Sequence, residues 1–278
     1  MTTWAAVSLD RVRRVRPQRR ASGLLRRVAP LLLVLAMLAA WQLWVSVADV
    51  APYLVPAPSR IAAAFLDSRH LLLGHLLTTT AEALLGMALG ALIGGLLAIA
   101  IASVGVLRRS LYPLLVVSQV IPIVVLAPLL VLWFGFGLTP KVVVVALIVF
   151  FPVVVSTVAG LTGVDREIVD LVRSMGGSRG QVLGTVLIPA AVPAFFSGLR
   201  ISAAYAVAGA VIGELVGAES GLGLFIDRSR ASYQVDRIFV AIALIALLSM
   251  ALFGLVALAA RLASPWRHVA DADGSERR

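Results

Sequence analysis

The sequence contains no cysteine, three histidines and a single lysine among its 278 residues, and only 14% of its residues are charged. Without cysteine there is no disulfide framework and no thiolate metal site. The histidines share no ligand spacing, so we expect no metal site; they are His70, His75 and His268. The lysine, Lys141, is not preceded by the Gly-x-x-x-x-Gly loop that binds nucleotide phosphates. The chain therefore has no ATPase site of this kind.

Apolar residues dominate what is present. They make up 60% of the chain, and the mean hydropathy is +1.01, whereas soluble domains are roughly 45–50% apolar. The formal charge of +10 could suggest nucleic-acid binding, but eight arginines lie between Arg11 and Arg27, ahead of the first apolar run. We interpret this leader as a cytoplasmic anchor at an anionic lipid surface.

Six apolar stretches are long enough to cross a membrane as helices. A spanning helix needs about 20 apolar residues, and the backbone must satisfy its own hydrogen bonds in lipid. The stretches lack the two-residue alternation of membrane β-strands. The expected spans are about 29–48, 77–103, 112–135, 141–161, 192–216 and 238–262. We expect the first to be an uncleaved helix, because its leader and its apolar run exceed those of a signal peptide.

The positions of the basic residues predict the orientation. If the N-terminus is cytoplasmic, most of the 24 Lys and Arg residues fall on the cytoplasmic side, as the positive-inside rule requires. We therefore expect a basic cytoplasmic leader at 1–28, a six-helix transmembrane domain at 29–262 and a cytoplasmic tail at 263–278. Gly86, Gly90 and Gly94 recur on one face of the second span and predict close helix packing, within the chain or at a subunit interface.

The loop at 164–191 should form two short cytoplasmic helices. Asp165 is a plausible N-cap, and apolar residues then recur at helical spacing up to Gly176-Gly177. Ser178 and Gln181 form a capping-box pattern that starts the second helix. We expect Pro189 and Pro193 to close this segment. Chemistry alone leaves two interpretations open, a rigid knob that binds a partner and an interfacial hairpin lying on lipid.

The loop also carries a motif. Asp170-Leu171-Val172 is followed after three residues by Gly176, and after nine more by Val186-Leu187-Ile188-Pro189. This pattern resembles the EAA loop of binding-protein-dependent ABC importer permeases, which reads Glu-Ala-Ala, three residues, Gly, nine residues, Ile-x-Leu-Pro. Leu171 and Val172 replace the alanines of the motif, and the other departures are conservative.

Three further segments are similar to the nitrate, sulfonate, taurine and pyrimidine-precursor permeases. They are Val55-Pro56-Ala57-Pro58-Ser59, Leu132-Trp133-Phe134-Gly135-Phe136-Gly137 and Gly221-Leu222-Gly223. In all, the resemblance covers about residues 50–260. It implies an all-α integral membrane protein with the type I importer fold, located in a bacterial inner membrane with both termini cytoplasmic.

The resemblance also implies the partners. Two permease copies pair, each offers its loop to a cytoplasmic ATPase subunit that binds the ATP, and an extracytoplasmic binding protein delivers the solute. The chain itself would be no enzyme, would bind no cofactor and would contact membrane lipid. The resemblance assigns ATPase coupling to the following loop residues: Asp170, Leu171, Val172, Gly176, Ser178, Val186, Ile188 and Pro189.

Polar residues inside spans are costly and are often functional. Gln119 precedes Pro122 on the third span, where proline frees backbone carbonyls that a pathway can use; the alternative is hydrogen bonding between helices. Arg200 could line the pathway or extend to the interface. Glu82 and Glu214, near the outer ends of their spans, could line an outer gate or serve structure, and Glu82 could pair with a basic group.

The solute is a small polar molecule according to the resemblance. The runs Phe196–Ile201 and Gly209–Glu214 look most similar to the pyrimidine-precursor (thiamine-pathway) and riboflavin branch; nitrate, sulfonate or taurine uptake is the alternative. A stand-alone secondary transporter would predict inverted repeats or ionisable residues at midplane depth, and neither is evident. A membrane-embedded enzyme is disfavoured because no H-E-x-x-H or G-x-S-x-G motif occurs.

Overall fold

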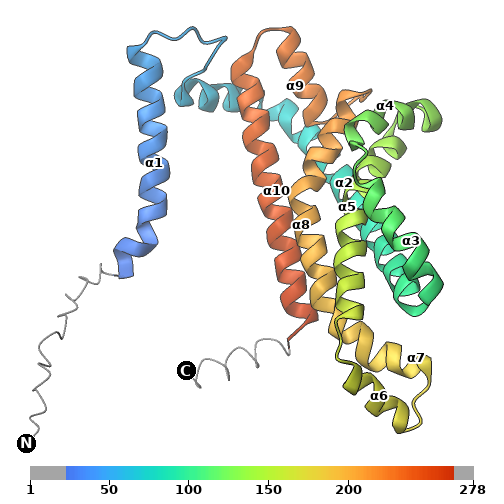
Figure 1. Cartoon of the computed structure of the whole chain (residues 1–278). Coiled ribbons are helices and arrows are strands. Elements are labelled where there is room, and N and C mark those ends of the chain that lie inside the picture. The colour runs from blue at the N-terminus through green and yellow to red at the C-terminus, as the bar shows by residue number, and fades with distance from the viewer. Residues whose placement is uncertain (1–22, 266–278) are drawn as a thin grey trace, which may run out of the picture. The chain divides into compact units, whose positions relative to one another are not determined.

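The computed structural model describes residues 23–265, with side chains from residue 28 onward, and contains helices but no strands in that range (Figure 1). The chain divides into two compact units, Met1–Val50 and Ala51–Arg278. In the first unit, α1 spans Gly23–Val47, and its apolar part from Val28 is long enough to cross a membrane. The predicted leader and tail lie largely outside the described residues.

The second unit is a bundle of long helices with short helices at both ends. In Figure 1, α5, α8 and α10 run side by side, with α6 and α7 at one end and α9 at the other. The helices are α2 (Pro58–Ser103), α3 (Gly105–Ser118), α4 (Ile123–Phe134), α5 (Leu138–Thr162), α6 (Arg166–Ser174), α7 (Arg179–Val182), the π-helix η1 (Leu183–Leu187), α8 (Ile188–Leu215), α9 (Leu222–Ala231) and α10 (Val235–Ala263).

Five candidate spans are confirmed as long apolar helical segments, and the sixth is broken. The sequence predicts one continuous third span at 112–135, which is wrong: α3 and α4 meet at an angle of 98°. The break falls between Ser118 and Ile123. Pro122 explains it, because proline has no N–H for the helical ladder and disfavours helical backbone in the residue before it. Counting this bent pair as one span gives the expected six.

Helix α2 is much longer than predicted. The hydropathy pattern starts this span at residue 77, but the helix begins at Pro58 and has 46 residues. Its first half carries charged residues such as Arg60 and Asp67, which conceal the apolar face from a hydropathy window. That face includes Ala64 and Leu72, which pack with residues of α9 and α10. Packing across the bundle therefore extends the helix beyond its most apolar stretch.

Helix α5 is the centre of the bundle, packed between α2 and α8. A Cβ added at Gly90 would lie 2.5 Å from the Ala146 carbonyl oxygen, and one at Gly94 would lie 3.0 Å from that of Phe150. Gly198 on α8 approaches the other side of α5 equally closely, at the Pro152 carbonyl oxygen. The predicted glycine face of α2 is confirmed as a packing face within the chain, where small residues let two backbones approach.

Candidate functional site

A compact knob of short helices protrudes at one end of the bundle. Asp165 caps α6 by accepting a hydrogen bond from the Glu167 N–H at 3.1 Å. The helix ends at Ser174, and Gly176 follows with φ of +84°, a left-handed conformation that glycine adopts without steric cost. Gly177 packs against Val172, with no room for a Cβ beside the Val172 carbonyl oxygen. The turn between the two short helices is thus defined by two glycines with different roles.

The predicted capping box starts α7. The Ser178 N–H donates to Gln181 Oε1 at 2.7 Å, and the Gln181 N–H donates to Ser178 Oγ at 3.3 Å. The expectation that Pro189 and Pro193 close the segment is wrong. The chain stays helical from α7 through η1 into α8. The π-helix changes the hydrogen-bond register directly before Pro189, with the Ile188 N–H donating to the Leu183 carbonyl oxygen, and Pro193 is accommodated inside α8.

The outer face of α6 exposes an apolar stripe. Ile168, Leu171 and Met175 are 49%, 60% and 79% exposed. They lie three and four residues apart, so they share one face of the helix. Asp170 lies beside the stripe, and its exposed carboxylate is 3.7 Å from a guanidinium nitrogen of Arg173. A continuous apolar stripe with a charged border is typical of a surface that binds a partner.

The eight residues assigned to coupling all fall on this knob or on its connection to the bundle. Three lie on α6, one in the turn, one at the start of α7, one in η1 and two at the start of α8: Asp170, Leu171, Val172, Gly176, Ser178, Val186, Ile188 and Pro189. The π-helix joins the knob to α8 without a flexible loop. A displacement of the knob would therefore be transmitted directly to α8.

The opposite end of the bundle contains a buried ion pair. Lys141 Nζ on α5 donates to Glu82 Oε1 on α2 at 2.9 Å, with the two side chains 6% and 1% exposed. Of the roles that the sequence leaves open for Glu82, the structure shows pairing with a basic group. The other oxygen of this carboxylate, Oε2, is buried and accepts no hydrogen bond from the described residues. Such a pair stabilises helix register only while both partners are present.

A second buried carboxylate, that of Glu214 on α8, joins three elements. Its Oε1 accepts from Thr79 Oγ1 on α2 at 2.6 Å, and its Oε2 accepts from the Gly223 N–H of α9 at 2.5 Å. Thr79 in turn accepts from the Leu222 N–H at 2.9 Å. Gly221, with φ of +126°, lies so close to the carboxyl group of Glu214 that a side chain would not fit. The first turn of α9 is thereby fixed to α2 and α8.

His75 also contributes to this end. Its Nδ1 accepts a hydrogen bond from the Gly221 N–H at 3.0 Å, and its ring lies 5.6 Å from that of Phe225. One turn further along α2, the hydroxyl groups of Thr78 and Ser220 are 3.1 Å apart. These contacts make His75 a structural partner of the α8–α9 turn.

A polar pocket of about 280 Å³ opens above the Lys141–Glu82 pair. Residues from α2, from the α4–α5 junction and from the α8–α9 turn line it: Thr78, Glu82, Phe136, Gly137, Leu138, Lys141, Glu219 and Ser220. Phe136 is 77% exposed and Glu219 is exposed, whereas the ion pair below is buried. The pocket thus combines an aromatic ring, two hydroxyl groups, two carboxylates and one ammonium group.

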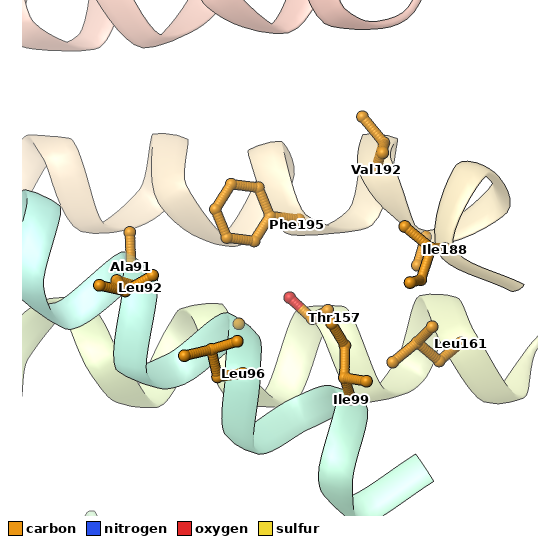
Figure 2. Close-up of a pocket in the computed structure, with 11 residues that line it drawn as sticks. Ala91, Leu92, Leu96, Ile99, Thr157, Leu161, Ile188, Val192 and Phe195 are labelled. Carbon is orange, nitrogen blue, oxygen red and sulfur yellow. The ribbon is translucent and has the colours of Figure 1, made fainter. Parts of the chain in front are cut away.

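A second pocket, of about 270 Å³, is apolar and lies between α2, α5 and α8 on the side of the knob (Figure 2). Figure 2 shows Phe195 and Ile188 from α8 facing Leu96 and Ile99 of α2. The hydroxyl group of Thr157 already donates to the Val153 carbonyl oxygen at 2.6 Å. With no free polar donor in its lining, this pocket offers an aqueous solute no specific contact.

The remaining pathway candidates lie apart from both clusters. Gln119 ends α3 and is exposed at the break before α4. Arg200 lies on α8, where its guanidinium group is 5.7 Å from the Phe253 ring centroid on α10 and its Nε has no hydrogen-bond partner among the described residues. The structure thus brings Glu82 and Glu214 to one end of the bundle but leaves Gln119 and Arg200 outside that group.

Sequence reasoning missed three residues of the buried cluster. Lys141 begins the expected span 141–161, but its burial and its partner were not predicted; His75 and Thr79 were not assigned to any site. One signal was available for Lys141: a glutamate in an apolar span needs a counter-charge, and the chain has one lysine. No local pattern identifies His75 or Thr79, since their partners are more than 130 residues away.

The fold and these two sites define a polytopic, all-helical membrane protein with a short-helix knob at one end. A sequence model of the family described as "Binding-protein-dependent transport system inner membrane component" matches residues 86–265. The chain belongs to this family, and it is a multi-pass inner-membrane permease subunit of an ABC importer.

Relatives with assigned solutes differ from one another. The chain is 36% identical to the formylaminopyrimidine transport permease ThiX of Halalkalibacterium halodurans, over 86% of this chain and 95% of that protein. It is 38% identical to the riboflavin permease RibX of Chloroflexus aurantiacus, over 84% and 88%. The taurine permease TauC of Escherichia coli is 30% identical, over 83% and 86%. The family is therefore established, while the named solutes diverge.

Solved structures support the fold. A chain of the MetNI methionine ABC transporter, in an inward-facing conformation, is similar with a TM-score of 0.63 and 19% identity, covering 71% of this chain and 98% of that one. A chain of an amino acid ABC transporter is similar with a TM-score of 0.59. The fold is thus similar to that of solved ABC importer chains.

Proposed function

We propose that this permease couples ATP hydrolysis by a separate subunit to solute uptake through the α6–α7 knob. The observation that carries the proposal is the exposed apolar stripe of Ile168, Leu171 and Met175, held on a helix whose ends are both fixed by local hydrogen bonds. A rigid apolar surface loses little conformational entropy when a partner covers it. The ATPase subunit, which carries the nucleotide, is that partner.

This proposal orients the molecule. The knob lies in the cytoplasm, together with the N-terminal leader at 1–28 and the tail at 263–278, and α9 lies on the outer side. There the binding protein delivers the solute. The basic residues concentrate on the cytoplasmic side in this orientation, which agrees with the positive-inside rule.

A second copy of the chain completes the pathway. Closed two-fold pairs are the commonest oligomers, and a pair presents two knobs to two ATPase subunits. ATP binding shifts the conformation only if the closed ATPase pair binds the two states of the permease with different affinity. The continuous α7–η1–α8 segment connects the knob to the pathway and would transmit the conformational change.

Four polar residues are candidates for the pathway within this framework. Gln119 lies at the bend between α3 and α4, where backbone carbonyls lose their helical donors. Glu82 and Glu214 lie in the buried cluster at the outer end, and Arg200 lies between α8 and α10. We assign Glu82 and Glu214 to shaping the outer gate and Gln119 to solute contact, and we place Arg200 in support of α8 against α10.

The favoured solute is a pyrimidine precursor or a riboflavin-like molecule. The relatives named for formylaminopyrimidine and riboflavin are 36% and 38% identical to this chain, against 30% for the taurine permease. Nitrate, sulfonate or taurine uptake is the alternative. A stand-alone secondary transporter is a more remote alternative, because such a transporter would need no exposed surface for an ATPase subunit.

Co-purification tests the proposal. The chain should be isolated in detergent with its ATPase subunit, and hydrolysis should be measured with and without solute-loaded binding protein. We expect a stable complex whose hydrolysis rises when loaded binding protein is added. A chain that purifies alone and moves solute without ATP would contradict the coupling role of the knob.

A further inference from the structure

We propose that the polar pocket at the α9 end is a solute site that accepts a neutral or cationic single-ring heteroaromatic molecule with N–H groups and disfavours organic anions. This inference rests on the proposed function, because it assigns a solute class to the importer. It concerns the pocket above the Lys141–Glu82 pair, which no local sequence motif marks.

The charge balance of the lining carries the selection against anions. Two carboxylates, those of Glu82 and Glu219, face one ammonium group, that of Lys141. The Glu214 carboxyl group lies in the same cluster, but both of its oxygens are already bonded, to Thr79 Oγ1 and to the Gly223 N–H. Lys141 is already paired with Glu82 at 2.9 Å. A sulfonate or nitrate ion would therefore meet an excess of like charge in a partly desolvated site, where such interactions are strong.

The remaining lining suits a planar molecule with donor groups. Phe136 presents an exposed ring, and Gly217 leaves the space for it, because a Cβ there would lie 2.6 Å from a ring carbon of Phe136. An aromatic solute can stack on such a face. The exposed Glu219 carboxylate is an acceptor that an N–H group of the solute can satisfy. The Thr78 hydroxyl group already donates to the Gly74 carbonyl oxygen at 3.1 Å, so the Ser220 hydroxyl group is the one that can donate to a ring nitrogen or a carbonyl oxygen.

The volume of the pocket limits the size of the solute. At about 280 Å³, the pocket lies at the small end of ligand pockets, which are typically about 300–1,000 Å³. A single substituted ring fits this space, whereas a fused three-ring molecule with a polyol chain would have to leave part of itself outside. Between the two favoured solutes, the pocket thus points to the aminopyrimidine class.

The absence of cysteine allows a direct test. Phe136→Cys introduces the chain's only thiol at an exposed position of the pocket. Its rate of modification by a charged methanethiosulfonate would be measured in the whole importer, both without nucleotide and trapped with vanadate, in the presence of formylaminopyrimidine or of the anion ethanesulfonate. Tyr233→Cys, at an 81% exposed residue outside this pocket, is the matched control.

We expect formylaminopyrimidine to slow the modification of Phe136→Cys at least threefold in one of the two states, ethanesulfonate to leave it unchanged, and Tyr233→Cys to respond to neither. Absence of protection in both states would overturn the proposal, and so would equal protection by ethanesulfonate.

Uptake by reconstituted importer separates this inference from the proposed function. Glu219→Lys should lower ATP-driven formylaminopyrimidine uptake at least tenfold while stimulation of the ATPase by loaded binding protein persists. Asp67→Asn, which removes an exposed carboxylate of α2 outside the pocket, should have no effect. Normal uptake by Glu219→Lys would refute the solute site alone. Uptake that needs no ATP in the wild-type protein would instead refute the coupling role.

Discussion

The two ends of the bundle are built in opposite ways. At the α6–α7 end, local interactions hold an exposed surface in place: an N-cap, a capping box and a left-handed glycine, all within 17 residues of sequence. At the α9 end, long-range contacts hold a buried cluster in place, with partners from α2, α5, α8 and α9. The first end is suited to exchange contacts with a partner, and the second to fix the helices relative to one another. Substitutions at the α9 end should therefore lower the stability of the fold, whereas substitutions at the α6–α7 end should impair coupling with little loss of stability.

The largest effect is expected at the buried ion pair. Lys141→Met leaves the Glu82 carboxylate buried without a counter-charge, which should destabilise the fold by about 3–5 kcal/mol. The exposed pair Arg230–Asp227 has the same 2.9 Å separation, so Arg230→Met is a matched control with an expected loss of about 0–1 kcal/mol. Unfolding in detergent and denaturant would measure both.

Removal of both buried charges sharpens this prediction. Lys141→Met combined with Glu82→Leu should recover most of the lost stability, because no uncompensated charge remains. If the double variant is no more stable than Lys141→Met, the loss comes from packing around Lys141 and our electrostatic account is wrong.

The close approach of α2 and α5 should give the next largest effect. Gly90→Ala places a Cβ 2.5 Å from the Ala146 carbonyl oxygen, so the two helices must separate. We expect a loss of about 1–3 kcal/mol from overpacking. Gly254→Ala on α10 meets no atom within 4 Å and should be neutral or slightly stabilising. Equal thermal stability of the two variants would contradict the packing described for α5.

A smaller effect on stability, with a large one on function, is expected in the knob. Gly176→Leu forces a side chain into a left-handed conformation, which costs about 1–2 kcal/mol, but there is space around it. The bundle should fold, and the ATPase should hydrolyse ATP without uptake. Gly180→Leu, at a glycine without positive φ and with the same free space, is the control. Normal uptake by Gly176→Leu would show that the turn geometry does not matter for coupling.

The smallest effect on stability is expected on the α6 surface. Leu171→Asp changes an exposed side chain and should alter stability by less than about 0.5 kcal/mol. It should nevertheless weaken retention of the ATPase subunit during purification. Gly180→Asp adds the same charge to α7, at an exposed position outside the stripe, and should retain the subunit. Loss of the subunit in both variants would mean that charge, and not the apolar contact, is responsible.

The contrast between short-range and long-range contacts also explains which parts of the molecule the sequence predicts. The caps at Asp165 and Ser178 and the glycine face of α2 depend on residues three or four positions apart, so spacing alone identifies them. The bend at Pro122 was missed because hydropathy averages over the break. The pairing of Glu214 with Thr79 joins residues 135 positions apart, and no local pattern encodes such a contact. The burial of Lys141 was not predicted for the same reason, since only its partner Glu82 explains it.

ATP-driven uptake by the reconstituted importer tests the central claim most directly. Proteoliposomes that contain this chain with its ATPase subunit would be loaded internally with ATP, and labelled formylaminopyrimidine with its binding protein would be added outside. We predict accumulation that requires hydrolysable ATP and is abolished by Leu171→Asp while the bundle stays folded. Uptake that continues without ATP, or with Leu171→Asp at the wild-type rate, would contradict the assignment of the α6–α7 knob as the coupling surface.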